Sequence, residues 1–436
     1  MAADPIEIGV GGYYVFYALA GNISSQYGYV NGTSTQYKGL MFQQEGEIHF
    51  TGRSKLDNGT TVGIVVELEG WNRAVAANGS PRQIDEAFLF AFGEWGRIEF
   101  GARDMASFRM YYGTPSALPS WGFVNSNTSF NWASGTMINN PSYRGVQNAA
   151  LGHQFQDANR INYFTPRFMG LQVGVGYAPK MNLAPGARVL APRLSSGPRN
   201  NTAGVCGYND ATSANNCPTN DNSWQNVVDI SANYLNKFGE VVVALYGGFM
   251  YGSFVPALQF NSSAVNLATG ANLSSWKQWA IGAQFGYGGF TLGGSIGYDN
   301  NGLGGNYYTG VDNDSRKYTA GIMYETGAWA MSFGWGGTRN AAGNGLPQLT
   351  AIAQGTSQAL TMPVAGNNAL AFGNQYVNGA LTFGSTSVDK LEIGVNYSLG
   401  TGIKVALGGI YWNAVGPTNA VVGESWAILM GMDLRF

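Results

Sequence analysis

The sequence predicts an all-β protein, a transmembrane antiparallel β-barrel of about 16 strands. Three observations predict this fold: alternating apolar residues near the C-terminus, a composition poor in charge, and tight turns separated by long polar segments. Over residues 426–436, large apolar side chains occupy every second position, and only Leu429 breaks the alternation. A period of two is typical of a β-strand with one apolar face and one polar face. We expect this strand, which ends on Phe436, to close the barrel.

The composition fits a membrane barrel better than a soluble domain. Charged residues make up 11% of the chain, whereas ordinary soluble domains hold about 25%. Yet no stretch approaches the roughly 18 to 20 consecutive apolar residues of a membrane-spanning helix. Strands that alternate lipid-facing and lumen-facing residues account for both facts. The net charge of −2 argues against a dedicated nucleic-acid-binding protein.

Short turns divide the predicted strands at regular places. They are Asp57-Asn58-Gly59, Glu94-Trp95-Gly96, Phe168-Met169-Gly170, Lys237-Phe238-Gly239, Gly288-Gly289, Gly327-Ala328 and Gly400-Thr401-Gly402. Asn-Gly and Gly-Gly pairs favour the positive φ angles of tight hairpins. The intervening connections are polar and reach about 50 residues, which is rare in compact domains. Short periplasmic turns and long extracellular loops are typical of outer-membrane barrels and not of a β-sandwich.

The strands are expected to begin close to sixteen positions in a single domain that spans residues 1–436. These positions are residues 6, 40, 61, 83, 97, 158, 171, 225, 240, 276, 290, 316, 329, 389, 402 and 425. An additional hairpin within residues 369–383 is an alternative that gives 18 strands. The start, Met1-Ala2-Ala3-Asp4-Pro5, is expected to be a mature terminus left by signal-peptide removal.

Residues 90–103, FAFGEWGRIEFGAR, and the Tyr-, Ser-, Asn- and Gly-rich segment after them resemble the fourth and fifth strands and the constriction loop of alphaproteobacterial general porins. The terminal Phe436 fits the same family of trimeric, sixteen-stranded barrels. The resemblance implies a loop, about residues 104–157, that folds into the barrel and narrows it. It also implies an outer-membrane porin, not an enzyme, that lets small hydrophilic solutes and ions diffuse passively. The family usually places an acidic cluster on this loop, whereas this loop carries few acids, so the family's charge pattern is not carried over.

The resemblance also implies the surroundings of the protein. They are the outer membrane of a Gram-negative bacterium, its lipid and lipopolysaccharide, and two further copies of the chain in a homotrimer, with no cofactor. Apolar faces of the first strands are expected to form the subunit contacts; they include Tyr14, Phe16, Phe50, Phe88 and Phe90.

Charged and aromatic residues from the loop and the adjacent wall are candidates for the constriction. The loop contributes Asp104, Arg109, Tyr111, Tyr112 and Arg144. Alternation directs Glu45, Glu47, Glu67, Glu69 and Asp85 inward on three adjacent strands, with Arg103 beside them. We interpret these acids as one wall of a transverse field that faces the arginines and makes the pore mildly cation-selective. The alternative is that they are solvated lumen residues without a specific role.

Two further groups of residues carry weaker signals. Cys206 and Cys217 are expected to form a loop disulfide worth about 3 kcal/mol, and free thiols are the alternative. Asp299, Asp312 and Asp314 form an oxygen-rich segment that is a calcium candidate, and a hydrophilic surface loop is the alternative.

Other functions remain open at the level of the sequence. A substrate-specific channel would need an aromatic track in the lumen, to which Tyr111 and Tyr112 belong. A structural or adhesive barrel would act through its long loops at about residues 180–224 and 339–388. Glu47 and His49 share a lumen face, but no serine stands in a nucleophile context, and we interpret the pair as polar filling.

Overall fold

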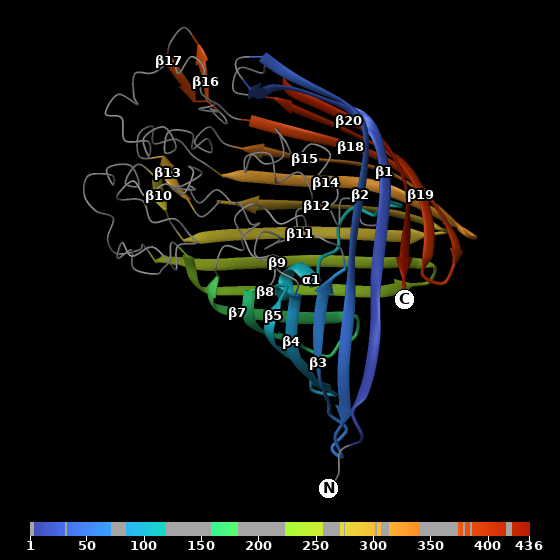
Figure 1. The fold of residues 1–436 in the computed structure, drawn as a ribbon. Coiled ribbons are helices and arrows are strands. Elements are labelled where there is room, and N and C mark those ends of the chain that lie inside the picture. The colour runs from blue at the N-terminus through green and yellow to red at the C-terminus, as the bar shows by residue number, and fades with distance from the viewer. Residues whose placement is uncertain are drawn as a thin grey trace.

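Antiparallel pairing between neighbouring strands runs around the whole molecule and joins the last strand to the first (Figure 1). The computed structural model describes residues 4–30, 33–70, 84–118, 158–181, 223–255, 271–273, 275–300, 303–306, 314–340, 374–377, 380–383, 386–415 and 421–436. Each strand of the barrel is hydrogen-bonded on both edges, which is the arrangement that a membrane demands because hydrocarbon offers no partner to backbone groups.

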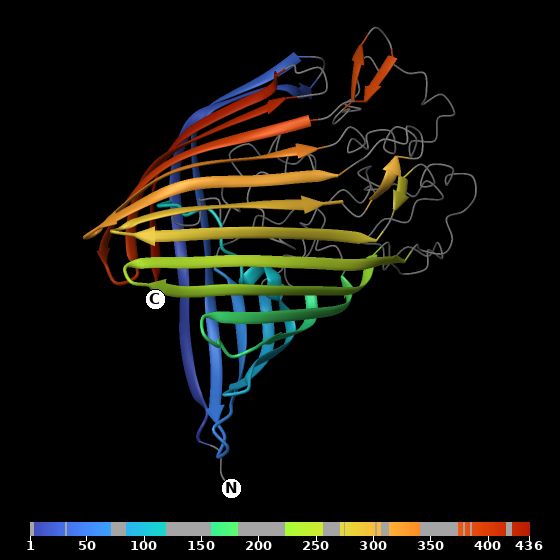
Figure 2. The ribbon, with the colours of Figure 1, turned by 180° about the vertical axis from the view of Figure 1, so that it is seen from behind.

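Sixteen strands form the closed barrel. They are β1 (Glu7–Val30), β2 (Thr33–Lys55), β3 (Thr61–Glu69), β4 (Ile84–Gly93), β5 (Gly96–Arg103), β6 (Ala158–Phe164), β7 (Leu171–Met181), β8 (Ser223–Phe238), β9 (Val241–Val255), β11 (Trp276–Tyr287), β12 (Phe290–Asp299), β14 (Ser315–Thr326), β15 (Trp329–Asn340), β18 (Thr386–Gly400), β19 (Ile403–Val415) and β20 (Val421–Arg435). Figure 2 shows from behind how the strands from β8 to β15 lie side by side.

The predicted closing strand is confirmed. β20 pairs with β1 in a register that places Met432 opposite Phe16. Beyond the strand, Gly12 and Phe436 exchange two backbone hydrogen bonds of 3.0 and 3.1 Å. The terminal aromatic residue therefore takes part in the seam of the barrel.

The predicted turns are also confirmed. They connect β2 to β3, β4 to β5, β6 to β7, β8 to β9, β11 to β12, β14 to β15 and β18 to β19, so antiparallel topology places them at one end of the barrel. Gly59 and Gly402 have φ angles of 83° and 76°, the left-handed region in which a glycine is favoured. Thus the short turns share one end, as the outer-membrane pattern predicts.

The strand starts agree with the prediction to within a few residues, with one exception. β2 begins at Thr33 rather than near residue 40. The 18-strand alternative is wrong, because β16 (Asn374–Val377) and β17 (Ala380–Phe383) pair only with each other. β10 (Ala271–Leu273) and β13 (Leu303–Asn306) form a second small sheet outside the barrel.

One short helix, α1 (Ala106–Arg109), is present in the described part of the chain. No helix within the described ranges has the length and apolarity needed to cross a membrane.

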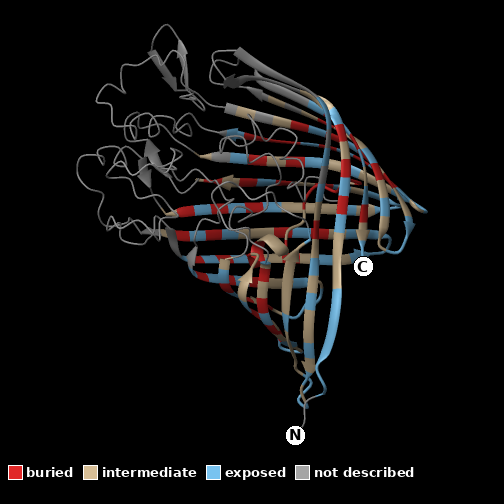
Figure 3. Cartoon of the chain, viewed as in Figure 1, coloured by how far each residue is buried: buried red, intermediate tan, exposed pale blue. Residues whose placement is uncertain are grey.

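The two faces of each strand differ as the alternation predicts. In β20 the side chains of Trp426, Ile428 and Met430 are exposed, whereas Ala427 and Leu429 are buried. Figure 3 shows this alternation of buried and exposed segments along the strands. A continuous apolar belt would be costly in water, at about 25 cal/mol per Å² of exposed apolar surface, so the outer face is built for lipid.

The expected subunit contacts need one correction. Tyr14, Phe16 and Phe50 are exposed on the outer face, but Phe88 and Phe90 are only 4% and 6% exposed. Both of these rings point into the barrel, where the guanidinium groups of lumen arginines lie over them. Phe88 and Phe90 therefore cannot contact a neighbouring subunit.

Candidate functional site

After β5 the chain turns into the barrel and follows its inner wall as far as residue 118. Its anchoring hydrogen bonds are Asn162 Nδ2 to Asp104 O (2.8 Å), Ser107 N to Asp229 Oδ2 (2.7 Å), Tyr246 Oη to Ser107 O (2.9 Å), Asn233 Nδ2 to Met110 O (3.1 Å), Gln284 Nε2 to Gly113 O (2.7 Å) and Ala117 N to Ser332 Oγ (2.8 Å). We name residues 104–118 the inner segment. Its partners in these bonds lie on five strands from β6 to β15, so it is fixed across a large part of the lumen wall.

Glycines on the wall make room for the inner segment. A Cβ on Gly282 would collide with the carbonyl oxygen of Tyr112, and one on Gly293 would lie 2.6 Å from the carbonyl oxygen of Gly113. The same close approach to the inner segment recurs at Gly174, Gly321 and Gly394. These wall glycines explain part of the high glycine content, which the sequence alone assigns to turns and strands.

An aromatic cluster packs the start of the inner segment against the wall. Met110 and Tyr246 are buried in it, and the rings of Tyr111 and Tyr246 meet edge to face with centroids 5.3 Å apart. The hydroxyl of Tyr111 is hydrogen-bonded to Ser295, and Tyr112 packs against the same cluster. These contacts favour a packing role for both tyrosines and do not support an aromatic track for a specific substrate.

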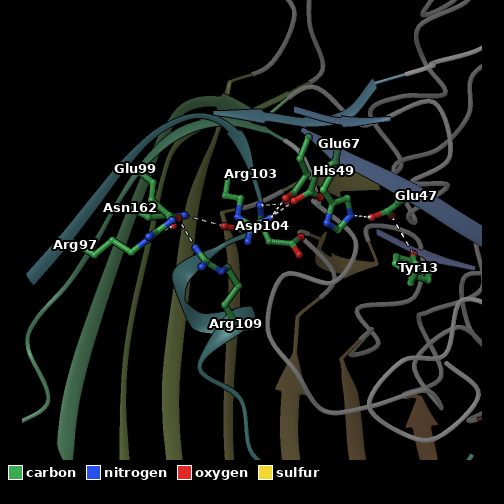
Figure 4. Close-up of polar contacts among 11 residues, drawn as sticks. Tyr13, Glu47, His49, Glu67, Arg97, Glu99, Arg103, Asp104, Arg109 and Asn162 are labelled. Atoms are coloured by element: carbon green, nitrogen blue, oxygen red, sulfur yellow. Dashed lines mark hydrogen bonds and ion pairs between the residues drawn. The ribbon is translucent and has the colours of Figure 1, made fainter. Parts of the chain in front are cut away.

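Arg103, the last residue of β5, holds two carboxylates of neighbouring strands. Its Nη1 forms an ion pair with Glu86 and lies 3.4 Å from Glu67 Oε1. The guanidinium carbon lies 4.5 Å from the centroid of the Phe88 ring. Arg103 is therefore paired within the wall itself, as Figure 4 shows for its neighbours Glu67 and Asp104.

A second group of ion pairs is formed around Glu99. It is 1% exposed and accepts a hydrogen bond of 2.6 Å from Arg97 Nε. Its other carboxylate oxygen pairs with Arg109 of α1, whose guanidinium carbon lies 4.9 Å from the centroid of the Phe164 ring. One buried carboxylate thus joins a wall arginine to an arginine of the inner segment (Figure 4).

The predicted acids of the wall lie together near the first strands. Tyr13 Oη donates hydrogen bonds of 3.1 Å to both Glu45 and Glu47. Glu69 is the backbone partner of Glu47 across β2 and β3. Asp85 interacts electrostatically with Glu47 and Glu69, so the five predicted acids share one region of the lumen.

Asp104 is the first residue of the inner segment, and the pKa of its carboxyl group is shifted. Its burial raises the pKa of the carboxyl group to about 6, although Arg103, Arg160 and Arg109 act in the opposite direction. Its backbone N–H donates a hydrogen bond of 2.9 Å to Glu86 Oε1. The charge of Asp104 therefore changes within the range from mildly acidic to neutral pH.

The charge arrangement differs from the facing walls that the sequence predicts. Arg103 and Arg109 do not stand opposite the acids but pair with Glu86, Glu67 and Glu99 on the same side of the barrel. The physical reason is burial: a partly desolvated arginine is stabilised by a carboxylate within hydrogen-bond reach.

Sequence reasoning missed Glu86 for an identifiable reason. Asp85 is assigned inward by strict alternation, which directs Glu86 toward lipid. The register between β3 and β4 shifts here, since Val66 pairs with Ala87 whereas Leu68 pairs with Ile84. Glu86 shares its face with Phe88 and Phe90, is 3% exposed and reaches Arg103, so alternation counted from Asp85 across the shift gives the rest of β4 the wrong face. Arg160 and Asp229, 3.7 Å apart, were missed too, although Asp229 stands between the apolar Val228 and Ile230.

Several predicted residues lie outside the described residues. They are Arg144 of the loop, the two cysteines Cys206 and Cys217, and Asp312. The proposed disulfide and the loop beyond residue 118 therefore stay predictions.

The calcium candidate is disfavoured at Asp299. Its carboxylate accepts hydrogen bonds of 2.7 Å from Trp276 Nε1 and Gln278 Nε2, and Lys317 Nζ lies 3.6 Å away. An amine cation and two N–H donors occupy the oxygens that calcium needs. Asp314 accepts a hydrogen bond of 2.5 Å from Tyr298 Oη. Among the described residues, the group with metal-ligand spacing is instead Glu47, His49 and Glu67.

Comparison with known proteins adds the family. A family model described as Gram-negative porin matches residues 17–411. The chain belongs to the Gram-negative porin family. As a member of it, the porin lies in the outer membrane and forms a channel for passive diffusion. A search of curated proteins finds no match.

Solved structures agree with this assignment in fold. An anion-selective porin from Comamonas acidovorans matches at 14% identity with a TM-score of 0.51, over 99% of this chain and 100% of that one. The outer-membrane channel DcaP of Acinetobacter baumannii matches at 10% identity with a TM-score of 0.55, over 99% and 97%. OmpT of Vibrio cholerae, in a trimer form, matches at 10% identity with a TM-score of 0.51, over 99% and 100%. At these identities the similarity shows the barrel fold alone.

Proposed function

We propose that the inner segment, residues 104–118, sets the size limit of this porin for small hydrophilic solutes and ions. The observation that carries the proposal is its anchoring, since hydrogen bonds from five strands hold one stretch of backbone inside the lumen. A channel of this kind needs no catalytic group, and we include the absence of enzymatic activity in the proposal.

We further propose that the cluster of acids on the first strands makes the pore mildly cation-selective. The wall holds Glu45, Glu47, Glu67, Glu69 and Asp85, and among the described residues Arg103 pairs with Glu67 of this group. Low-dielectric walls focus the field of such charges and raise the local concentration of cations.

The reversal potential across a planar bilayer in a salt gradient tests this selectivity. We expect cation preference for the wild type and a clear reduction for a Glu45→Gln/Glu69→Gln variant. Glu7→Gln is the matched control, because it removes the same charge from an exposed residue that pairs with Arg53 near the turn end of the barrel. Anion preference of the wild type would contradict the proposal.

The assembly is proposed to be a homotrimer. Membership in the porin family supports it, and so does the trimer form of the Vibrio cholerae protein of similar fold. The exposed side chains of Tyr14, Phe16 and Phe50 supply an apolar surface on the first two strands for the contact. Native mass spectrometry of the detergent-solubilised protein is expected to give a mass of three chains, and a monomer would contradict this part of the proposal.

A further inference from the structure

A histidine and two glutamates converge on the lumen face of β2 and β3. His49 Nε2 lies 2.8 Å from Glu47 Oε2, two residues along the same face of β2. Glu67 of β3 is the direct backbone partner of His49. One ligand atom of each of the three side chains lies within 4.8 Å of the others. Figure 4 shows the three residues side by side.

The donor set has a definite chemical preference. An imidazole nitrogen with two carboxylate oxygens suits Zn²⁺, Cu²⁺ and Ni²⁺, whereas Ca²⁺ and Mg²⁺ prefer oxygen ligands alone. Zinc holds such donors at about 2.0–2.2 Å, which places two of them about 3.3 Å apart in a tetrahedral site. The three donor atoms lie within 4.8 Å of one another and must move closer together to reach this spacing. Three protein ligands leave one position for water, as in open zinc sites.

Neighbouring groups already orient the ligands. Tyr13 Oη donates to Glu47 Oε1, which leaves Oε2 toward His49, and the Tyr13 ring meets the imidazole edge to face at 6.3 Å. Arg103 Nη1 holds Glu67 from the other side at 3.4 Å. Such outer partners fix the orientation of ligands and contribute to metal affinity.

Charge and access favour an ion at this place. All three ligand side chains are partly exposed, so an ion can reach them from the lumen. Glu69 and Asp85 add negative charge around the same point, and Glu45 shares the Tyr13 hydroxyl with Glu47. A divalent cation would offset part of this negative charge.

We propose that Glu47, His49 and Glu67 bind a divalent transition-metal ion of the zinc class in the pore wall. The bound ion adds two positive charges beside the permeation path and lowers the cation preference of the pore.

Isothermal titration of the detergent-solubilised protein, purified without a histidine tag, with Zn²⁺ tests the site directly. One ion per chain is expected. His49→Gln and Glu67→Gln are each expected to weaken binding by at least about tenfold, since even outer partners of a metal site cost 10–100-fold when lost. His153→Gln, which removes the other histidine of the chain, is the matched control and is expected to bind as the wild type does.

Spectroscopy identifies the ligand independently of affinity. With Cu²⁺, the electron paramagnetic resonance spectrum of the wild type and of His153→Gln is expected to show coupling to an imidazole nitrogen, and that of His49→Gln is expected to lack it. Binding of Zn²⁺ that is equally strong in His49→Gln, or lost in His153→Gln, would overturn the proposal. Because these measurements need no ion flow, their failure would leave the proposed channel function untouched.

Discussion

Gly282 of β11 lies directly beneath the carbonyl oxygen of Tyr112, with no room for a Cβ atom between wall and inner segment. A Cβ atom on Gly174 would likewise collide with Met110, and one on Gly293 with the carbonyl oxygen of Gly113. Glycines in the wall, together with hydrogen bonds to it, therefore determine the path of the inner segment.

Replacing that glycine is expected to push the inner segment away from the wall. Gly282→Ala forces Tyr112 toward the pore axis, so single-channel conductance is expected to fall. The overpacking is expected to lower the free energy of unfolding by about 1–3 kcal/mol. Gly247→Ala is the control, because the nearest atom to its Cβ is Ile281 Cγ2 at 3.9 Å. Equal conductance of both variants would refute the close packing.

Removing the charge of Glu99 is expected to change both stability and selectivity. Glu99→Gln leaves Arg97 and Arg109 without their shared carboxylate. Breaking a fully buried pair costs about 3–5 kcal/mol, and we expect about 2 kcal/mol here because both arginines are partly exposed to water. The reversal potential is expected to move toward anions. A move toward cations would show that these arginines do not face the permeating ions.

Asp104 is expected to make the pore depend on pH. Above a pKa of about 6 its carboxylate adds one negative charge near the lumen, so cation preference is expected to rise between pH 5 and pH 7. The folded-state pKa lies above the ordinary value of 3.8, so folding favours the protonated form. Barrel stability is therefore expected to fall as pH rises from about 4 to about 6 and to level off above it.

The variant Asp104→Asn isolates this contribution. It is expected to abolish the part of the selectivity change that is centred near pH 6 and to leave the response of the other acids. Reversal potentials measured at several pH values check this. An unchanged profile in Asp104→Asn would assign the titration to another group.

A charged side chain on the outer face of β20 is expected to destabilise the barrel. Met430 is 64% exposed on the lipid-facing side. Met430→Arg is expected to lower the free energy of unfolding in lipid by about 2–4 kcal/mol if the residue lies near the bilayer midplane. Met430→Leu, which keeps volume and polarity, is expected to cost less than about 1.5 kcal/mol. Urea unfolding in liposomes measures both, and equal stability of the two variants would argue against lipid contact there.

The strands and turns were predictable from the sequence because their signals are local. Alternating apolar residues directly reflect the lipid on one side of a strand and the water on the other. Glycines at turn positions, such as Gly59 and Gly402, directly reflect the positive φ angles of tight turns. The exception is β2, whose first residues, from Thr33 on, are mostly polar and show no clear alternation of apolar and polar side chains.

The pore interior was predictable only in part because its signals depend on partners far apart in sequence. Alternation counted from Asp85 across the register shift in β4 directed both Glu86 and Phe88 outward, although Arg103 pairs with Glu86 and lies over the Phe88 ring. The glycines under the inner segment could not be distinguished from other strand glycines, since the contact with Tyr112 exists only in the folded barrel. Residues 104–118 were placed in the lumen by family resemblance rather than by their own pattern.

Chemical modification of a cysteine at Arg109 tests the position of the inner segment most directly. In a Cys206→Ser/Cys217→Ser background, Arg109→Cys is exposed to a thiol reagent while single-channel current is recorded. Leu89→Cys, on the lipid-facing side of β4, is the control. A stepwise loss of current in Arg109→Cys and none in Leu89→Cys is the predicted result. Modification of Arg109→Cys without any change in current would contradict an inner segment that narrows the pore.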